Sequence, residues 1–326
     1  MVWNDTMGSV GRTQGPAARE SERKEKDQQR RAMERSNAKD LNELDSYIRH
    51  ITGLHHETIK VIDWQALAAK PAPLAPEMDL TNSENVRRQL AQHEAGFVEW
   101  LMGRGKQTRA ALERALDLAR SRQHREILAK LAPYHSLVQA WETEQAVCHG
   151  VMTGDDGAML SVIKSQQTLT KIHKLGRGLG FSVQGGVVHA VLSLHKTNIV
   201  PDFQFKYMPS GKLTEVKMPR EKTMKLYRAY ASSAVLKVAS DLFRVIPRES
   251  VIVSCVAPCH VADSDYDEEW PVLSVRFNRR DVMALPMDRT DPVQAMRLFN
   301  VAEAFHPIHG FGRIAPILDI PVRMAI

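Results

Sequence analysis

The spacing of apolar residues changes once along this 326-residue chain, and the change limits the folds that are open to it. From about residue 41 to residue 174, apolar side chains recur every three or four positions, which is typical of amphipathic helices. From residue 181 onward, runs such as 187–195 alternate apolar and polar residues, which indicates strands with one buried face. The chain therefore predicts the α+β class, with an N-terminal helical section followed by an α/β domain that has a mixed, largely antiparallel sheet.

Three stretches of different composition divide the chain. Residues 1–40 are polar and have almost no large apolar side chains, so they predict a disordered or solvated helical arm. Residues 41–157 form the helical section, which a proline-rich linker interrupts near residues 71–76. Residues 158–326 form the α/β domain, with a C-terminal helix and tail.

Two long helices are expected in the helical section, at 108–131 and 134–152, after a helix capped by Thr81-Asn82-Ser83-Glu84. An antiparallel helical hairpin of this kind packs on itself or on a second chain. We therefore expect a homo-oligomer or a protein partner through this section. A shorter helix at 158–174 precedes the first strand.

Six strands and one long helix are expected in the α/β domain. Phe203, Phe205 and Tyr207 alternate with polar residues, and a turn at residues 208–211 leads into a return strand at 212–218. The other predicted elements are strands at 181–183, 187–195, 251–257 and 272–277, and a helix at 222–246 with one apolar stripe.

The net charge of +6 is concentrated in residues 161–228, which hold twelve Lys and Arg against three acidic residues. A polyanion is the natural partner for such a segment, and its phosphates would supply affinity with little sequence preference. A solvated basic face without a partner is the alternative. The residues expected to bind nucleic acid are Lys171, Lys174, Arg177, Lys206, Lys212, Arg220, Lys222, Lys225 and Arg228.

One motif in this basic segment indicates chemistry. Pro201-Asp202 is followed, thirteen residues after Asp202, by Glu215-Val216-Lys217. Two carboxylates can share a divalent metal ion while a lysine holds the water that attacks a phosphodiester. The motif, together with the order of helix, strands, helix and strand, resembles the αβββαβ core of PD-(D/E)xK nucleases, which have a restriction-endonuclease-like fold, over roughly 120 residues.

The resemblance implies roles for three residues. Asp202 and Glu215 would be catalytic ligands of a Mg²⁺ ion, and Lys217 would orient the attacking water. The implied activity is phosphodiester hydrolysis in DNA processing or in defence against foreign DNA. The segment from Phe205 to Pro247 is also similar to an uncharacterised family of bacterial proteins, through Ser210-Gly211-Lys212, Val216-Lys217-Met218-Pro219 and VASDLFRVIP.

Two features leave a non-catalytic reading open. If Ser210-Gly211 forms the turn, Glu215 lies opposite Lys206, and Asp202 lies four residues, roughly 13 Å, beyond that position. An antiparallel hairpin with a polar face is also an ordinary solvated surface. The alternative function is therefore an interaction or scaffold protein with a degenerate nuclease-like or unrelated α/β domain.

An acidic run from Asp263 to Glu269 is expected to be a solvated loop that competes with nucleic acid for the basic surface.

Cysteine usage and hydropathy indicate the compartment. Three cysteines, Cys148, Cys255 and Cys259, are too few for a secreted disulfide framework. No apolar run approaches the roughly 18 residues of a membrane span, and residues 1–12 lack the apolar region of a signal peptide. We therefore expect a cytoplasmic protein without a membrane partner.

Overall fold

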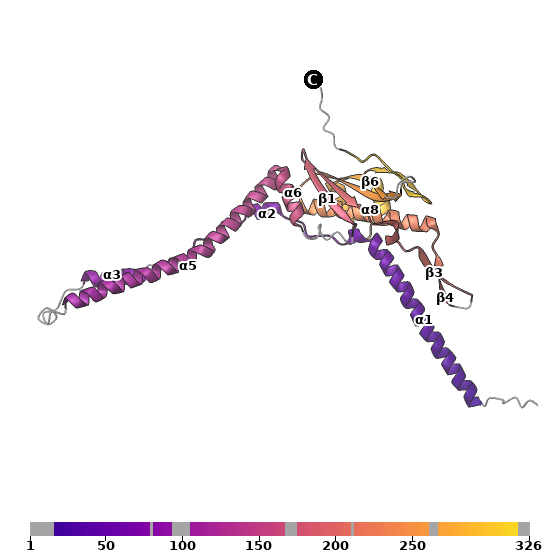
Figure 1. Ribbon diagram of the computed structural model, residues 1–326, viewed down its shortest axis with the longest axis horizontal. Helices are drawn as coiled ribbons and strands as arrows, with labels where there is room; N and C mark the ends of the chain where they lie inside the picture. The colour runs from indigo at the N-terminus through magenta and orange to yellow at the C-terminus, as the bar shows by residue number, and fades with distance from the viewer. Residues whose placement is uncertain are drawn as a thin grey trace, which may run out of the picture. The chain divides into compact units, whose positions relative to one another are not determined.

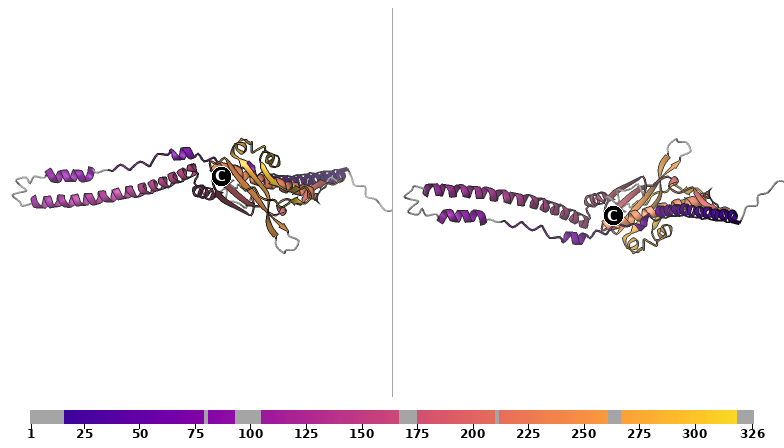
Figure 2. Two further views of the ribbon diagram at one scale, coloured as in Figure 1. Left: turned by 90° about the horizontal axis from the view of Figure 1, so that it is seen from above. Right: turned by 90° about the horizontal axis from the view of Figure 1, so that it is seen from below.

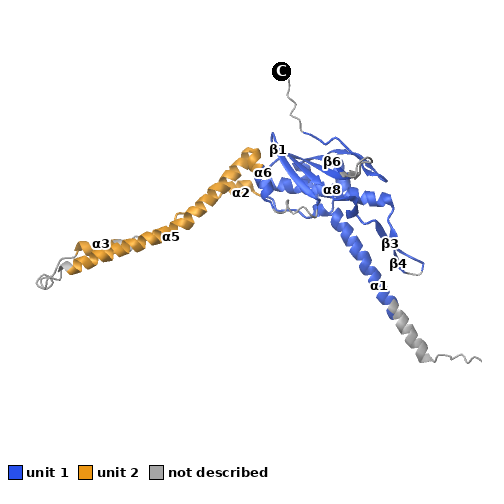
Figure 3. Cartoon of the chain, in the orientation of Figure 1, with its two compact units in different colours: residues 1–61, 160–326 blue, residues 62–159 orange. Residues whose placement is uncertain are grey.

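The computed structural model describes residues 16–78, 81–92, 105–166, 175–209, 212–260 and 267–318. The chain divides into two compact units (Figure 3), one of residues 62–159 and the other of residues 1–61 and 160–326. The sequence assigns residues 41–61 to the helical section, whereas the structure places them in the unit that contains the sheet. No helix in the described ranges is long and apolar enough to cross a membrane.

The unit of residues 62–159 is built on one long helix, α5 (Gly105–Thr153). The prediction of two helices that separate near residue 133 is wrong, because α5 continues through Pro133. A proline inside a helix removes one backbone hydrogen bond and crowds the preceding turn. The half-buried side chains of Ile127, Tyr134 and Val138 keep one stripe in phase on both sides of Pro133, so packing outweighs the local cost.

The proline-rich segment 70–78 connects α2 (Trp64–Ala68) to α3 (Thr81–Gln92) and runs beside α5 (Figure 2). The Trp141 indole donates to the Lys70 carbonyl at 3.0 Å, and the Lys130 ammonium donates to the Glu77 carbonyl at 3.2 Å. Side chains of α5 thus satisfy carbonyl groups that the prolines keep out of regular structure.

The expected association through this unit stays a prediction. Leu118, Leu128 and Leu137 of α5 are 50%, 52% and 60% exposed. At about 100° per residue they point in three different directions, so these leucines do not form one continuous apolar stripe.

The second unit contains a five-stranded sheet with the order β1-β2-β5-β6-β7 (Figure 1). Only β2 and β5 run parallel to each other, and the other neighbours are antiparallel. Gly185 and Gly186 have φ of +59° and +81°, so they provide the two-residue turn between β1 and β2 that other residues adopt at a cost. The strands are β1 (Gly178–Gln184), β2 (Val187–Ser193), β5 (Ser250–His260), β6 (Asp267–Asn278) and β7 (Asn300–Glu303).

Helix α8 (Arg220–Val245) is the centre of this unit, and it packs on β5 and β6. On its other sides lie the end of α1 (Pro16–Thr52), the short helix η1 (Leu54–His56), and the helices α9 (Arg279–Ala284) and α10 (Pro292–Ala295). The sequence predicts one apolar stripe along α8, whereas every residue from Tyr230 to Phe243 is buried. A helix enclosed on all sides must also bury its polar side chains, and each of these then needs a partner.

Segment 55–59 supplies partners for three of those polar side chains. The His55 ring nitrogen Nδ1 lies 2.8 Å from the Ser233 hydroxyl, Lys237 donates to the Glu57 carbonyl, and the Ile59 amide donates to Asp241 at 3.4 Å. Ser233, Lys237 and Asp241 recur every four residues, about 6 Å along a helix, while two residues of an extended segment span roughly 6.6 Å. The two spacings match, so the segment follows one face of α8; we call residues 55–59 the strap.

The strap also covers a buried ion pair. The Lys237 ammonium lies 2.8 Å from a carboxylate oxygen of Asp241, and the two side chains are 11% and 1% exposed. Burial raises the pKa of Asp241, and the Lys237 charge opposes that rise. His55 is fully buried, and its Nε2 lies 2.9 Å from the Thr290 carbonyl, so Nε2 carries the proton and Nδ1 accepts from Ser233.

The hairpin that carries the nuclease-like motif lies outside the five-stranded sheet. β3 (Phe203–Tyr207) and β4 (Leu213–Lys217) pair only with each other, and they project from the sheet (Figure 1). The α+β class is confirmed, with a mixed, mostly antiparallel sheet, but Asp202 and Glu215 are not on strands of that sheet. A second small pair consists of β8 (Phe305–His306) and β9 (Gly310–Phe311), and η3 (Thr197–Ile199) precedes β3.

Replacing Lys237 by alanine is expected to lower the free energy of unfolding by about 3 to 5 kcal/mol, because the Asp241 carboxylate stays buried without its counter-charge. Urea denaturation at pH 7 measures this loss. The double variant Lys237→Met, Asp241→Leu is the control and should recover most of the stability, since it buries no charge. A loss below about 1 kcal/mol in the single variant would contradict a buried ion pair.

The stability contributed by His55 is expected to decrease as the pH falls. Burial lowers the pKa of His55, so below about 6.5, the ordinary pKa of histidine, the unfolded chain binds a proton that the folded chain resists. Urea denaturation from pH 8 to pH 5 measures the free energy of unfolding. For His55→Gln it should be lower than for wild type by roughly 2 kcal/mol at pH 8, and this gap should narrow at lower pH. His50→Gln, at an exposed position of α1, should follow wild type throughout. A gap that stays constant with pH would rule out this role of His55.

Candidate nucleic-acid interface

Pro209 determines the register of the hairpin. A two-residue turn at 210–211 would pair Pro209 with Lys212, but proline has no N–H to donate. Instead the Met208 amide donates to the Lys212 carbonyl at 2.9 Å. Phe205 therefore lies opposite Glu215, and the predicted pairing of Glu215 with Lys206 is wrong by one residue.

This one-residue difference moves the acidic residue of the motif to the other face of the hairpin. Glu215 and Lys217 lie opposite Phe205 and Phe203, so they share the aromatic face. The Met218 amide donates to the Asp202 carbonyl at 2.7 Å, which continues the same register and places Asp202 opposite Met218. The structure therefore does not bring Asp202 to the face that carries Glu215.

The two carboxylates do not fit a shared Mg²⁺ ion. Asp202 is three residues, roughly 10 Å at strand rise, from the position opposite Glu215, and an odd offset places their side chains on opposite faces. Oxygen ligands of Mg²⁺ lie about 2.1 Å from the ion. In the part of the chain that the structure describes, no three His, Cys, Asp or Glu side chains form a group that could hold a metal.

Basic side chains gather on the hairpin and on the adjacent first turn of α8. Lys206, Lys212 and Lys217 are exposed, and none of them has a carboxylate partner among the described residues. Lys222 donates to the Gln204 side-chain oxygen at 2.9 Å, and Arg220 Nε donates to the Ile308 carbonyl at 2.9 Å. The positive charges of these five residues are thus not neutralised within the described chain; we call them, together with Tyr207, the hairpin surface.

An exposed aromatic ring also belongs to the hairpin surface, on the face of the ribbon that carries Lys217 and opposite to the face that carries Lys206. Tyr207 is 63% exposed and follows Lys206 directly. Phe203 and Phe205 are half-buried instead, with ring centroids 5.7 Å apart, and they line a hollow of about 390 Å³ against α1. The Tyr47 hydroxyl of α1 donates to the Ile199 carbonyl at 2.7 Å, which fixes the base of the hairpin. The sequence predicts the alternation that includes Tyr207 but not its exposure, because that depends on how far α1 extends along β3.

Three other predicted nucleic-acid ligands have carboxylate partners. Arg177 pairs with Glu269, Lys225 lies 2.6 Å from Glu221, and both carboxylate oxygens of Glu303 accept from Arg228, with Nε at 2.8 Å. The Arg228 guanidinium also lies 4.8 Å from the Phe305 ring centre. These residues contribute less positive potential than the hairpin surface does. Lys171 and Lys174 lie outside the described residues.

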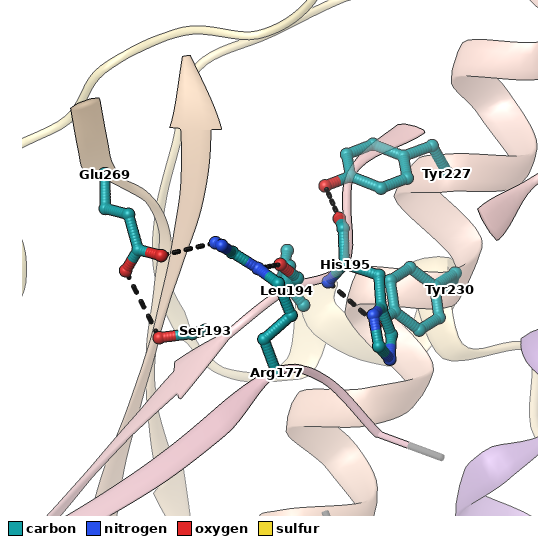
Figure 4. Close-up of polar contacts among 7 residues, drawn as sticks. All are labelled: Arg177, Ser193, Leu194, His195, Tyr227, Tyr230 and Glu269. Atoms are coloured by element: carbon teal, nitrogen blue, oxygen red, sulfur yellow. Dashed lines mark hydrogen bonds and ion pairs between the residues drawn. The ribbon is translucent and has the colours of Figure 1, made fainter. Parts of the chain in front are cut away.

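The Arg177 pair belongs to a network at the end of β2 (Figure 4). Arg177 Nε donates to the Leu194 carbonyl at 2.9 Å, and Glu269 accepts from the Ser193 hydroxyl at 3.3 Å. From α8, Tyr227 donates to the His195 carbonyl at 2.7 Å and Tyr230 to the Leu175 carbonyl at 2.6 Å. Burial raises the pKa of Tyr230, so its hydroxyl stays protonated as a donor. The network connects β1, β2 and β6 to α8 and holds Arg177 away from the hairpin surface.

Comparisons with known proteins suggest no function for this chain. A scan against protein-family models and searches of curated proteins and of solved structures found no match to the chain.

The register of the hairpin can be tested with engineered cysteines. Tyr207 and Leu213 face each other at a pair without mutual backbone hydrogen bonds, where Cα atoms lie about 4.5 Å apart and a disulfide can form. Tyr207→Cys with Leu213→Cys should therefore cross-link on mild oxidation, as read by mass spectrometry. The control is Tyr207→Cys with Thr214→Cys, which matches the register of a two-residue turn. Preferential cross-linking of that control would reverse the facial assignment of Glu215 and Lys217.

Proposed function

We propose that this protein binds nucleic acid through the hairpin surface, without a requirement for catalysis. The observation that supports the proposal is that Lys206, Lys212 and Lys217 carry exposed charges, unpaired among the described residues, on a two-stranded ribbon outside the main sheet. Net charge alone would be a weaker support, because several other basic residues of the segment are engaged by carboxylates.

The shape and chemistry of the hairpin suit contact with a polyanion. A two-stranded ribbon is narrow enough to enter a major groove or to lie along a single strand. The lysines can neutralise phosphates, while the exposed ring of Tyr207 offers a face on which a base can stack. Contacts of this kind read charge and shape, so we expect little sequence preference.

A nuclease-like core is a more specific alternative, and the sequence motif and the order of helices and strands support it. The register argues against a shared ion between Asp202 and Glu215, so we derive no hydrolytic step through a metal. A role in DNA processing or in defence against foreign DNA remains compatible with binding alone, as an adaptor that recruits other activities.

Neutralising the lysines of the hairpin surface should weaken binding and its dependence on salt. For Lys206→Gln, Lys212→Gln, Lys217→Gln, fluorescence anisotropy with labelled duplex DNA should show a slope of log K against log salt that is smaller by about 2 to 3, since each lost phosphate contact removes about 0.9. Tyr207→Ala should reduce affinity for single strands about tenfold and affinity for duplex DNA less, because stacking needs an unpaired base.

A second triple variant, Lys39→Gln, Lys60→Gln, Arg109→Gln, removes the same charge outside the hairpin and serves as the control. Equal losses in the two triple variants would reduce the effect to net charge and would contradict the proposed surface. EDTA should leave the affinity unchanged. Cleavage of plasmid DNA with Mg²⁺ or Mn²⁺ that disappears in Glu215→Ala would instead favour the nuclease alternative.

A further inference from the structure

An open cleft of about 680 Å³ lies between the end of α1, η1, the first half of α8 and the start of α10, all within the unit that contains the sheet. Small-molecule sites usually occupy about 300 to 1,000 Å³. None of the lining residues belongs to the β3–β4 hairpin, so the cleft is separate from the hairpin surface.

The lining combines cations with apolar side chains. Arg49, His56, Lys225 and Arg228 supply positive charge or N–H donors. Leu226, Ala229, Pro292 and Val293 supply apolar area on which a flat ring can rest. A site with this composition suits a ligand that joins an anionic group to an apolar ring.

Two of these cationic side chains, Arg49 and Lys225, can bind an anion that enters the cleft. Arg49 uses Nε to bind the Asp45 carbonyl at 3.2 Å, and its terminal nitrogens have no partner among the described residues. Lys225 pairs with Glu221 at 2.6 Å, but that pair is solvent-exposed on one helix, and a phosphate can displace such a pair. Arg228 is committed to Glu303, so it orients the wall and adds little net charge.

The walls of the cleft are held by contacts on several elements. Buried His55 connects η1 to Ser233 of α8 and to the Thr290 carbonyl. Asp291, the acidic residue of the lining, accepts from the Val293 and Gln294 amides at 2.8 and 3.0 Å, so its carboxylate caps α10. A Cβ on Gly53 would lie 2.7 Å from the Arg49 carbonyl oxygen and 2.9 Å from the His56 ring, so glycine lets the backbone and the ring approach each other there. A cleft with such walls is formed before a ligand arrives.

We propose that this cleft binds the phosphomonoester of a nucleotide-sized ligand, with Arg49 and Lys225 on the phosphate and the sugar or base against Leu226 and Val293. The phosphate can belong to a free mononucleotide or to the 5′ end of a nucleic-acid strand, since both present the same dianion. The cleft does not depend on the hairpin surface, so either proposal can fail alone.

Titration calorimetry of the full chain tests the cleft with adenosine 5′-monophosphate, adenosine and inorganic phosphate. The monophosphate is expected to bind at least about tenfold more tightly than adenosine, because charge-assisted hydrogen bonds need the phosphate. Arg49→Gln and Lys225→Gln should each weaken binding about tenfold. Lys60→Gln is the control, since it removes an exposed lysine of the same unit that neither lines the cleft nor belongs to the hairpin surface.

Oligonucleotides with and without a 5′ phosphate identify the source of the anion. Tighter binding of the phosphorylated strand that is lost in Lys225→Gln and kept in Lys60→Gln would assign the cleft to strand ends. Equal binding of both strands, with monophosphate binding that needs Lys225, would assign it to free nucleotides. No binding of the monophosphate or the phosphorylated strand at millimolar concentration, or an equal loss in Lys60→Gln, would overturn the proposal.

Discussion

The enclosure of α8 is the constraint on which the rest of the larger unit depends. A helix buried from Tyr230 to Phe243 leaves little solvent for its polar side chains, so Ser233, Lys237 and Asp241 depend on partners from another part of the chain. The strap provides three of these partners at spacings that match successive turns of the helix. This requirement explains why residues that lie 178 to 182 positions before their partners in α8 fold with that helix and not with the unit of residues 62–159.

The periodicity of the sequence predicts elements well where one local pattern decides the outcome. The alternation around Val188 and Leu192 and the apolar stripe along residues 222–246 correspond to β2 and α8. The same reasoning fails at Ser233, Lys237 and Asp241. A polar residue every fourth position on a helix ordinarily indicates its solvent face, and only the tertiary position of the strap shows that this face is covered.

In the candidate site, too, the local sequence explains some features, whereas others depend on residues far away in the chain. Pro209 is visible in the sequence, and its missing N–H is enough to explain the register, although a two-residue turn at Ser210-Gly211 predicts the wrong pairing. The partners of Arg177 and Arg228 lie 92 and 75 positions away, so no local pattern reveals that these two charges are engaged. The motif with Asp202 and Glu215 is a match in spacing, and the backbone arranges it on two faces.

The isolation of the β3–β4 ribbon has a further consequence for solubility. Each of its two strands has one edge without a strand partner among the described residues, and such edges readily pair with edges of other molecules. Lysines on an exposed edge oppose that pairing by repulsion and by the cost of burying a charge. The side chains of Lys206, Lys212 and Lys217 therefore disfavour edge-to-edge pairing of this ribbon with another copy, and removing their charge would weaken that protection.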